Sequence, residues 1–413
     1  MAKTVLAIGA FDTKGPDYDF IRQLILLRGH AVVTVNTGVL ATTDLFSVDV
    51  EADELATAGG ATLQQLRQTG DRGEAMKVMS AGAAVVARRL YDEGRFDGII
   101  GMGGSGGSTV VTAAMRALPV GVPKVCVSTV ASGDTSGYVG LSDVTLIPSI
   151  ADVAGINRIS RLIYSRAAGA ICGMVETEIS AVTDERPVIA ASMFGNTTQC
   201  VDACSKSLTE SGYEVLVFHA TGVGGRTMES LVDEGLVDAV LDITTTEWAD
   251  EVCGGVFSAG PDRLSGPGRK GIPHLIVPGC VDMANFHGMD NVPQHYRDAD
   301  RLFYEWNPSV ALMRTNVEEN RKMGESFAAA AKVAQGPVAF LFPKQGVSIL
   351  DGDGEQFCDR VADEALFGAI RQHVKGGAIR IEEVDANIND VAFSNRAVEM
   401  MHELISQGKG TTD

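Results

Sequence analysis

Short apolar runs alternate with longer amphipathic stretches along the first half of the chain. The apolar run at 5–11 is followed by a segment with helical periodicity and then by a second apolar run at 30–38. The same alternation returns with an apolar run at 96–104, an amphipathic segment at 108–118 and an apolar run at 124–129. Strands that alternate with helices in this way predict a parallel sheet covered by helices.

The pattern begins again after residue 187, and the second set of segments matches the first. The alignment pairs VLAIGAFDTKG with VIAASMFGNTT and so places Phe194 at the position of Phe11. It also pairs LLRGHAVVTVNTG with TESGYEVLVFHATG, FDGIIGMGG with VDAVLDITT, and GVPKVCVS with GIPHLIVP. Four blocks in the same order predict an internal repeat. We therefore expect an α/β protein of two doubly wound, Rossmann-like parallel-sheet domains, at 1–182 and 183–413, facing one another across a cleft.

Composition and charge narrow the class of protein. Hydrophobic residues make up 45% of the chain and charged residues 21%, which suits globular domains with sizeable cores. The net charge of −19 would repel nucleic-acid phosphates and anionic lipid, and no basic run offsets it. The first residues lack the basic and apolar segments of a leader peptide, so we expect none, and no run reaches about 18 uncharged apolar residues. We expect a cytoplasmic protein that binds neither nucleic acid nor membranes.

The 47 glycines exceed the usual share of about 7% and gather at predicted strand-to-helix turns. The strongest signal is GMGGSGGS at 101–108, because backbone N–H groups and a helix N-terminus at such a turn suit a phosphate. The ribose-binding acid of a dinucleotide site and the lysine of a P-loop are both missing. Alternatively, the glycines form a tight turn that packs the helix on the strand. The candidate phosphate-binding residues are Gly103, Gly104, Ser105, Gly106, Gly107 and Ser108.

Two further loops are expected at the same edge of the first sheet. After the first strand, Lys14 is a candidate for a phosphate, Thr13 for a hydrogen bond, and Asp12 for a hydrated Mg²⁺ or a ribose hydroxyl. The alternative is an ordinary helix cap. After the third strand, the hydroxyls of Ser128 and Thr129 suit the wall of a ligand site, with a plain surface loop as the alternative.

The second half carries different loop chemistry, including HATGVGG as a second glycine-rich anion loop. Candidate substrate-binding residues are His219, Thr221, Gly222, Gly224, Arg314 and Lys344. Candidate catalytic residues, for a nucleophile, a base or a metal site, are Glu247, Cys280, Asp282 and His287. Structural roles as caps or buried side chains are the alternative. Their spacing is not specific for a metal, so we assign no metal ligands.

Long sequence blocks are spread over the whole chain, among them GAFDTKG, GMGGSGGS, FGNTT, HATGVGGRTMESL, DITTTE, VPGCVDMANF, MRTNVEENRKMGE and FPKQGVSILD. Together they resemble the UPF0261 family of Tm-1-like ATP-binding proteins, which is homologous to the N-terminal region of the tomato mosaic virus resistance protein Tm-1. The resemblance implies a Mg-ATP site in the N-terminal domain and a tendency to form homodimers. Plant members fuse this region to a TIM-barrel domain, which implies a separate TIM-barrel protein as an alternative partner.

Three functions compete on these grounds. The first is ATP-dependent phosphorylation or activation of a small anionic metabolite, with ATP and Mg²⁺ held by the first domain and the metabolite by the second. The second is metal-assisted or acid–base-assisted hydrolysis or lysis of a small carboxylate by the second-domain residues. The third is a non-enzymatic nucleotide sensor that works with a TIM-barrel protein.

Overall fold

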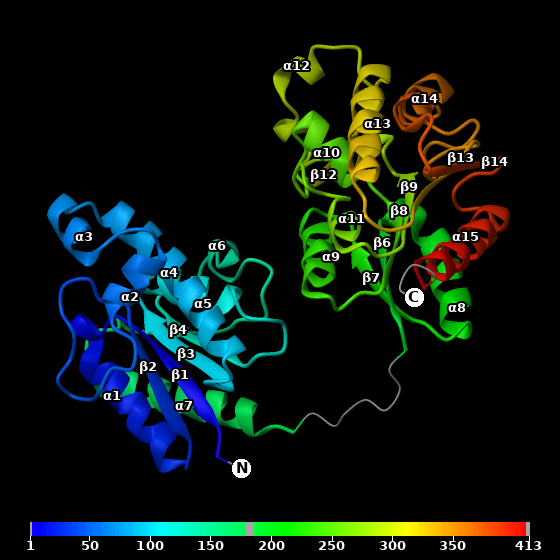
Figure 1. The fold of residues 1–413 in the computed structure, drawn as a ribbon. Helices are drawn as coiled ribbons and strands as arrows, with labels where there is room; N and C mark the ends of the chain where they lie inside the picture. Colours follow the sequence, from blue (N-terminus) through cyan, green and yellow to red (C-terminus); the bar gives the residue numbers. More distant parts are fainter. Residues whose placement is uncertain (1, 179–185, 410–413) are drawn as a thin grey trace. The chain divides into compact units, whose positions relative to one another are not determined.

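The computed structural model describes residues 2–178 and 186–409 (Figure 1). The chain divides into two compact units, Met1–Ala181 and Val182–Asp413. The expected boundary near residue 182 lies outside the described residues, and the cleft between the domains stays a prediction.

The N-terminal unit is built on a parallel sheet of five strands in the order β2-β1-β3-β4-β5. The strands are β1 (Thr4–Gly9), β2 (Ala31–Asn36), β3 (Gly98–Gly103), β4 (Lys124–Ser128) and β5 (Thr145–Pro148). The helices are α1 (Phe11–Leu27), α2 (Ala52–Ala58), α3 (Leu63–Thr69), α4 (Arg72–Asp92), α5 (Ser105–Arg116), α6 (Ser136–Val139) and α7 (Arg158–Glu176). Successive residues of β1 face opposite sides: Leu6 and Ile8 pack with α2, α4 and α5, whereas Val5 and Ala7 pack with α1 and α7. The predicted parallel sheet with helices on both faces is confirmed.

The C-terminal unit has a parallel sheet of six strands in the order β14-β13-β9-β8-β6-β7. The strands are β6 (Val188–Met193), β7 (Glu214–His219), β8 (Ala239–Thr244), β9 (His274–Gly279), β13 (Val338–Pro343) and β14 (Arg380–Val384). The α-helices are α8 (Thr198–Glu210), α9 (Val223–Glu234), α10 (Glu247–Cys253), α11 (Gly266–Lys270), α12 (Gln294–Arg297), α13 (Val317–Lys332), α14 (Arg360–Val374) and α15 (Val391–Lys409). Helices α8 and α15 cover one face of the sheet, and α9, α10, α13 and α14 cover the other.

The two parallel sheets share a strand order, as the internal repeat predicts. The order β7-β6-β8-β9 in the second unit matches β2-β1-β3-β4 in the first. In each sheet the order reverses at its first strand, β1 or β6. Ligands of open α/β sheets bind beyond the carboxyl ends of the strands at such switch points.

A small antiparallel sheet in the C-terminal unit has no counterpart in the repeat. It contains β10 (Met283–Phe286), β11 (Phe303–Asn307) and β12 (Val310–Arg314) in the order β10-β12-β11. The apolar pattern predicts the buried strand β12 but not β11, which is largely exposed. This sheet therefore adds a wall to the second unit that sequence periodicity does not reveal.

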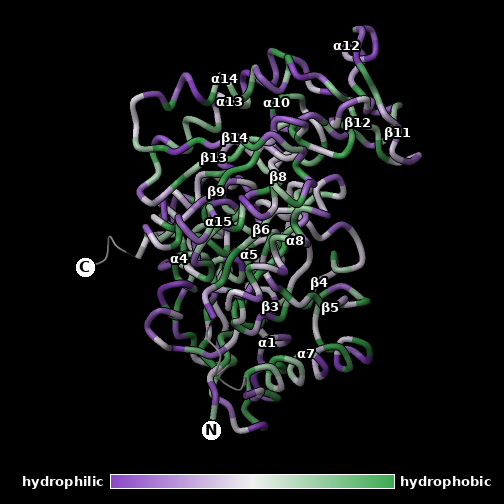
Figure 2. Tube along the Cα trace, turned by 90° about the vertical axis from the view of Figure 1, so that its right-hand side faces the viewer, coloured by the Kyte–Doolittle hydropathy of each residue, from purple (hydrophilic) through white to green (hydrophobic). Residues whose placement is uncertain are grey.

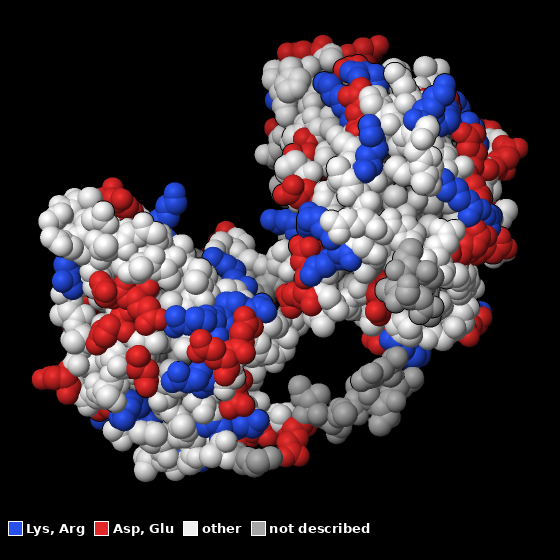
Figure 3. Space-filling model, viewed as in Figure 1, with Lys and Arg blue, Asp and Glu red and all other residues white. Residues whose placement is uncertain are grey.

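The distribution of side chains agrees with these layers. Figure 2 shows hydrophobic stretches along central strands such as β8 and β9, and alternating colours along amphipathic helices such as α7. On the face drawn in Figure 3, acidic and basic side chains are interspersed over both units. Within the described ranges, none of the helices has the length and apolar character that a membrane span requires.

Candidate functional site

The first glycine loop, residues 103–107, leaves the N-terminus of α5 open. Gly104 is the N-cap of this helix, and no side chain caps it. The N–H of Ser108 donates to the carbonyl of Gly104 at 2.8 Å, but the N–H groups of Ser105, Gly106 and Gly107 have no acceptor among the described residues. Three N–H groups at the positive end of the helix dipole are thus available at the carboxyl edge of the sheet.

Two glycines near this turn are required by packing. A Cβ on Gly101 would lie 2.4 Å from Cγ1 of Val111, and one on Gly103 would lie 2.7 Å from Cα of Gly107. Real Cβ atoms essentially never come this close to another atom. At Gly101 and Gly103, close packing of the helix on the strand explains the glycine.

The next three glycines are not required by packing. A Cβ on Gly104, Gly106 or Gly107 would have its nearest neighbour at 3.8, 3.5 or 3.6 Å, which is ordinary van der Waals contact. Their φ angles are not positive either. The neighbour of Gly104 is Oγ1 of Thr129, and that of Gly106 is Nη2 of Arg72. Close approach of a ligand to the backbone would account for glycine at these positions.

Ser108 and Ser128 have a structural role. Their hydroxyl oxygens lie 2.5 Å apart and both side chains are buried, so the pair joins α5 to β4. The Ser108 hydroxyl also donates to the carbonyl of Gly103 at 3.2 Å, and that of Ser128 accepts from the N–H of Val130 at 3.2 Å. This geometry leaves neither hydroxyl free for the ligand contact that the sequence predicts.

A cavity of about 350 Å³ lies at the carboxyl ends of β4 and β5. Its lining contains the predicted residue Thr129 and the polar residues Ser132, Ser149 and Asp152, together with Pro148, Ile150 and Ala151. Ile150 has a φ of +65°, which is strained for a β-branched residue, and its side chain is exposed. Strained positions of this kind cluster at ligand sites.

The polar side chains of the loop after β1 differ in their exposure and in their hydrogen-bond partners. The Lys14 amino group donates to the carbonyl of Val153, and no carboxylate lies within 4.0 Å of it in the described ranges. Thr13 is exposed. Oδ2 of Asp12 accepts from the N–H of Leu40 at 3.2 Å, whereas Oδ1 is buried without a partner among the residues described. Among the described residues, neither Lys14 nor Asp12 therefore has an ion-pair partner.

Arg72 is a candidate that the sequence does not reveal. It is exposed at the start of α4, and its Nη2 lies 3.5 Å from where a Cβ of Gly106 would stand. No ion pair neutralises it in the part of the chain that the structure describes. Nothing in the sequence connects the start of α4 with the glycine loop, because the contact depends on how α4 packs against α5.

The second glycine loop, residues 222–225, binds the carboxylate of a glutamate of the same chain. Oε1 of Glu247 accepts from the N–H groups of Gly222 at 2.7 Å and Gly225 at 3.0 Å. Oε2 accepts from Nε of Arg263 at 2.7 Å, and the Glu247 side chain is fully buried. A Cβ on Gly225 would lie only 2.1 Å from Oε2. Glu247 therefore anchors the loop, and neither it nor Gly222 is free for a substrate.

Arg263 extends this anchor into a buried polar network. Its guanidinium donates to both carboxylate oxygens of Asp242, at 2.8 and 2.5 Å, and His274 lies 3.1 Å from the same carboxylate. Burial by itself would raise the pKa of Asp242, but the charge and hydrogen bonds of Arg263 outweigh it and hold the pKa well below its ordinary value. Asp242 and Arg263 thus form a buried ion pair, which suits a structural role. Gly224, also in this loop, packs against the backbone of His219, whose carbonyl oxygen would lie 1.9 Å from an added Cβ.

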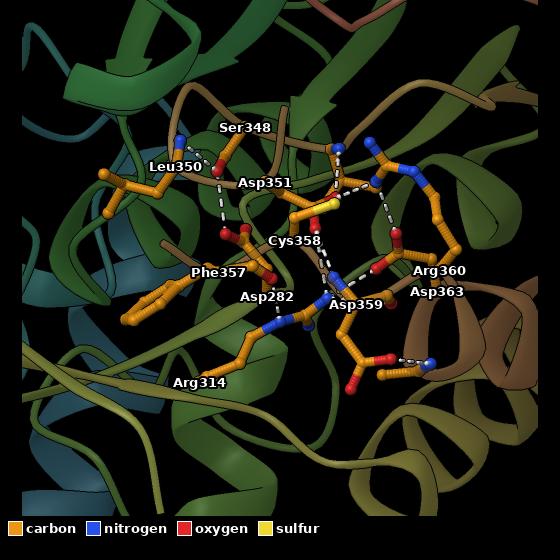
Figure 4. Close-up of polar contacts among 12 residues, drawn as sticks. Asp282, Arg314, Ser348, Leu350, Asp351, Phe357, Cys358, Asp359, Arg360 and Asp363 are labelled. Carbon is orange, nitrogen blue, oxygen red and sulfur yellow. Dashed lines mark hydrogen bonds and ion pairs between the residues drawn. The ribbon is translucent and has the colours of Figure 1, made fainter. Parts of the chain in front are cut away.

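Cys280 and Asp282 both follow β9 and are buried. Figure 4 shows the surroundings of Asp282. Burial, and then the charge of Asp282, raise the pKa of the Cys280 thiol well above its ordinary value, so it is protonated at neutral pH. Asp282 accepts from the Ser348 hydroxyl at 2.7 Å, and burial raises its pKa to about 6. In the described structure, neither His287 nor Glu247 hydrogen-bonds to this pair. His287 is exposed after β10, so the four predicted catalytic residues do not form one constellation.

The two cations predicted to bind an anionic substrate are neutralised within the protein. Nη2 of Arg314 lies 2.7 Å from Asp363 and 3.2 Å from Asp351 (Figure 4). The amino group of Lys344 lies 3.4 Å from each of two glutamate carboxylates. The remaining two predicted substrate-binding residues, His219 and Thr221, line a separate cavity of the same unit. Across the described ranges, no group of three His, Cys, Asp or Glu side chains is arranged to hold a metal ion.

Comparisons with known proteins cover both units. The N-terminal and C-terminal domain models of the uncharacterised protein family UPF0261 match residues 3–180 and 186–405. A UPF0261 protein of Clostridium tetani (strain Massachusetts / E88) is 43% identical over 98% of this chain and 99% of its own length. The ToMV resistance protein Tm-1(GCR237) of Solanum lycopersicum is 36% identical over 97% of this chain and 55% of its own length. Among solved structures, UDP-N-acetylglucosamine 2-epimerase from Rickettsia bellii matches with a TM-score of 0.24 and 11% identity, over 67% of this chain and 78% of that chain, a likeness too weak to carry an argument.

Proposed function

This chain belongs to the UPF0261 family, and from that membership and the geometry of the first glycine loop we propose that its N-terminal unit binds Mg-ATP, with the phosphates on residues 104–107. The observation that carries the proposal is the coincidence of two features. Three N–H groups lack an acceptor among the described residues, and the three glycines that the fold does not require lie at the same turn. Backbone amides at a helix N-terminus are suited to phosphate oxygens.

Two cations support a phosphate at this position. Lys14 follows β1, which pairs directly with β3, and its amino group is not neutralised by a carboxylate in the described ranges. Arg72 lies beside Gly106 from the other side. In a protein of net charge −19, two such cations at the carboxyl edge of one sheet are the local exception that an anionic ligand needs.

The remaining parts of the nucleotide have candidates nearby. The hydroxyls around the 350 Å³ cavity after β4 and β5 suit the ribose and the base. Asp12 fits the accompanying Mg²⁺, because its Oδ1 is buried without a partner among the described residues and Mg²⁺ in nucleotide sites is held by one or two carboxylates together with phosphates. When bound, Mg²⁺ would neutralise phosphate charge.

Calorimetric titration of Mg-ATP into the full chain tests the proposal. Gly104→Val, whose side chain would enter the space above the open N–H groups, is expected to abolish binding. Lys14→Ala and Arg72→Ala are each expected to weaken it about tenfold, as for the loss of a charge-assisted hydrogen bond.

Gly173→Val is the matched control. Gly173 lies near the end of α7 and an added Cβ there would meet nothing within 4 Å, so this variant should bind Mg-ATP as the wild type does. Wild-type affinity in Gly104→Val would overturn the placement of the phosphates.

A further inference from the structure

A second cavity, of about 230 Å³, lies at the carboxyl edge of the sheet in the C-terminal unit. The ends of β6 and β7 form one wall, and β11 and β12 of the small antiparallel sheet form another. Four of its ten lining residues carry rings, and the lining consists of Phe194, Gly195, Asn196, His219, Thr221, Phe257, Trp306, Asn307, Val310 and Leu312. We call it the aromatic cavity.

The rings of the aromatic cavity lie close together at an angle, with interplanar angles of 36° between Phe194 and His219 and 64° between Phe194 and Phe257. The centroid of Phe194 lies 5.4 Å from that of His219 and 6.1 Å from that of Phe257. The Trp306 side chain is 51% exposed, although burial of so large an apolar ring is favourable. A flat ligand could stack on one of these rings and meet the others at their edges.

Asn196 adds a polar group with unused hydrogen-bonding capacity. Its side chain is buried, with only 2% exposed, and its Oδ1 has no partner among the described residues. Its Nδ2 donates to the sulfur of Met283 at 3.2 Å, and thioether sulfur is a weak acceptor. The backbone carbonyl of Asn196 accepts from Asn389 and Ile349, which fixes the residue in place. The oxygen of this buried amide lacks a donor and its nitrogen has only a weak acceptor. Such a group lowers the stability of the fold unless a ligand supplies the missing hydrogen bonds.

The lining also limits the charge of the ligand. It contains no Lys, Arg, Asp or Glu side chain. The cations predicted to bind an anionic substrate, Arg314 and Lys344, are neutralised by carboxylates and do not line this cavity. The ligand is therefore expected to be uncharged where it contacts the protein.

Size and backbone both favour a single ring system. The volume is below the range of about 300–1,000 Å³ that is usual for pockets of drug-sized ligands. Gly195 lines the cavity, its φ is not positive, and an added Cβ would meet no atom within 4 Å. As at the first glycine loop, the fold does not require this glycine, but a closely approaching ligand would.

We propose that the aromatic cavity binds an uncharged nitrogen heterocycle of the nucleobase class, stacked on its rings and hydrogen-bonded along one edge to the amide of Asn196. Aromatic side chains stack on any base, and an asparagine amide pairs in a bidentate way with a ring edge that offers a donor next to an acceptor. This site is independent of the Mg-ATP site proposed for the N-terminal unit.

Tryptophan fluorescence tests the proposal directly, because the chain has two tryptophans and only Trp306 lines the cavity. Adenosine, guanosine, cytidine and uridine are titrated into the full chain carrying Gly104→Val, so that the first glycine loop cannot contribute. At least one nucleoside is expected to quench the fluorescence saturably. Trp306→Phe should remove this signal while calorimetry still detects binding of the same nucleoside.

Variants of the recognition residues complete the test. Asn196→Ala and Trp306→Ala are each expected to weaken nucleoside binding about tenfold. Trp306→Ala alters a half-exposed side chain and should fold normally if Asn196→Ala does not. Benzyl alcohol, a ring without a paired donor and acceptor, should bind wild type and Asn196→Ala equally. Absence of quenching by all four nucleosides at millimolar concentration, or wild-type affinity in the variants, overturns the proposal, whatever the outcome for Mg-ATP.

Discussion

The two glycine loops look alike in sequence but differ in what their N–H groups bind. In the first loop, the N–H groups of Ser105, Gly106 and Gly107 have no acceptor among the described residues. In the second, the N–H groups of Gly222 and Gly225 both donate to Glu247. The first loop is available to an external anion, whereas the second already contains an internal one.

The difference shows that glycine content alone does not identify a ligand site. A glycine-rich turn exposes amides, and these amides must be satisfied by something. In the C-terminal unit a carboxylate from the turn after β8 performs this role, and its charge is balanced by Arg263. A buried glutamate of this kind replaces the ligand and converts an anion site into a structural clamp.

The largest effect that tests this comparison is expected from Glu247→Ala. The change leaves two buried N–H groups without an acceptor and removes one partner of Arg263, so the free energy of unfolding should fall by about 3–5 kcal/mol. Urea unfolding followed by tryptophan fluorescence is suited to this, because Trp248 and Trp306 both lie in the C-terminal unit. Glu318→Ala, on the exposed face of α13, is the matched control and should leave the transition unchanged.

Added acetate tests whether the missing carboxylate explains the instability of Glu247→Ala. Removal of the Glu247 carboxylate would leave a space of matching chemistry between the glycine amides and Arg263. Acetate should therefore raise the unfolding midpoint of Glu247→Ala and not that of the wild type. A variant that is as stable as the wild type would show that Glu247 does not hold the second loop.

The sequence predicted much of the fold, because alternating apolar runs and the internal repeat follow directly from how β6, β8 and their counterparts are buried. The repeat alignment places Asn196 at the position of Thr13, but an asparagine at that position does not by itself indicate a ligand site. The capture of Gly222 by Glu247 was not predictable in the same way. These residues follow different strands, β7 and β8, and they meet because both strands flank β6 in the sheet. Trp306 was missed for a related reason, since the exposed strand β11 lacks the apolar pattern of a core strand.

A second buried carboxyl of the C-terminal unit makes its stability depend on pH. Asp250 accepts two hydrogen bonds of 2.7 Å from Asn285, and burial raises its pKa from 3.8 to about 8. Between these values the folded chain binds a proton that the unfolded chain has released. The free energy of unfolding should therefore fall as the pH rises, by at most about 1.4 kcal/mol per pH unit.

Asp250→Asn isolates this contribution, because the amide does not titrate. Urea unfolding at pH 5, 6 and 7 should show a shallower decline in the variant than in the wild type. The comparison uses the slope, since the amide also replaces an acceptor of Asn285 and lowers stability at every pH. Equal slopes would mean that Asp250 is already ionised in the folded protein at these pH values.

The smallest expected changes in stability distinguish the glycine of the first loop that packing requires, Gly103, from one that it does not, Gly106. Gly103→Ala forces a Cβ to 2.7 Å from Gly107 and should cost about 1–3 kcal/mol. Gly106→Ala has only ordinary contacts and replaces a glycine in the first turn of α5, so it should raise the free energy of unfolding by about 0.5–1 kcal/mol. Far-UV circular dichroism in urea measures both, and calorimetry should find weaker Mg-ATP binding in Gly106→Ala than in the wild type. A glycine that lowers the stability of the fold is expected at positions where the backbone binds a ligand closely. If Gly106→Ala proved as destabilising as Gly103→Ala, packing would explain the whole loop, and its contrast with the loop held by Glu247 would disappear.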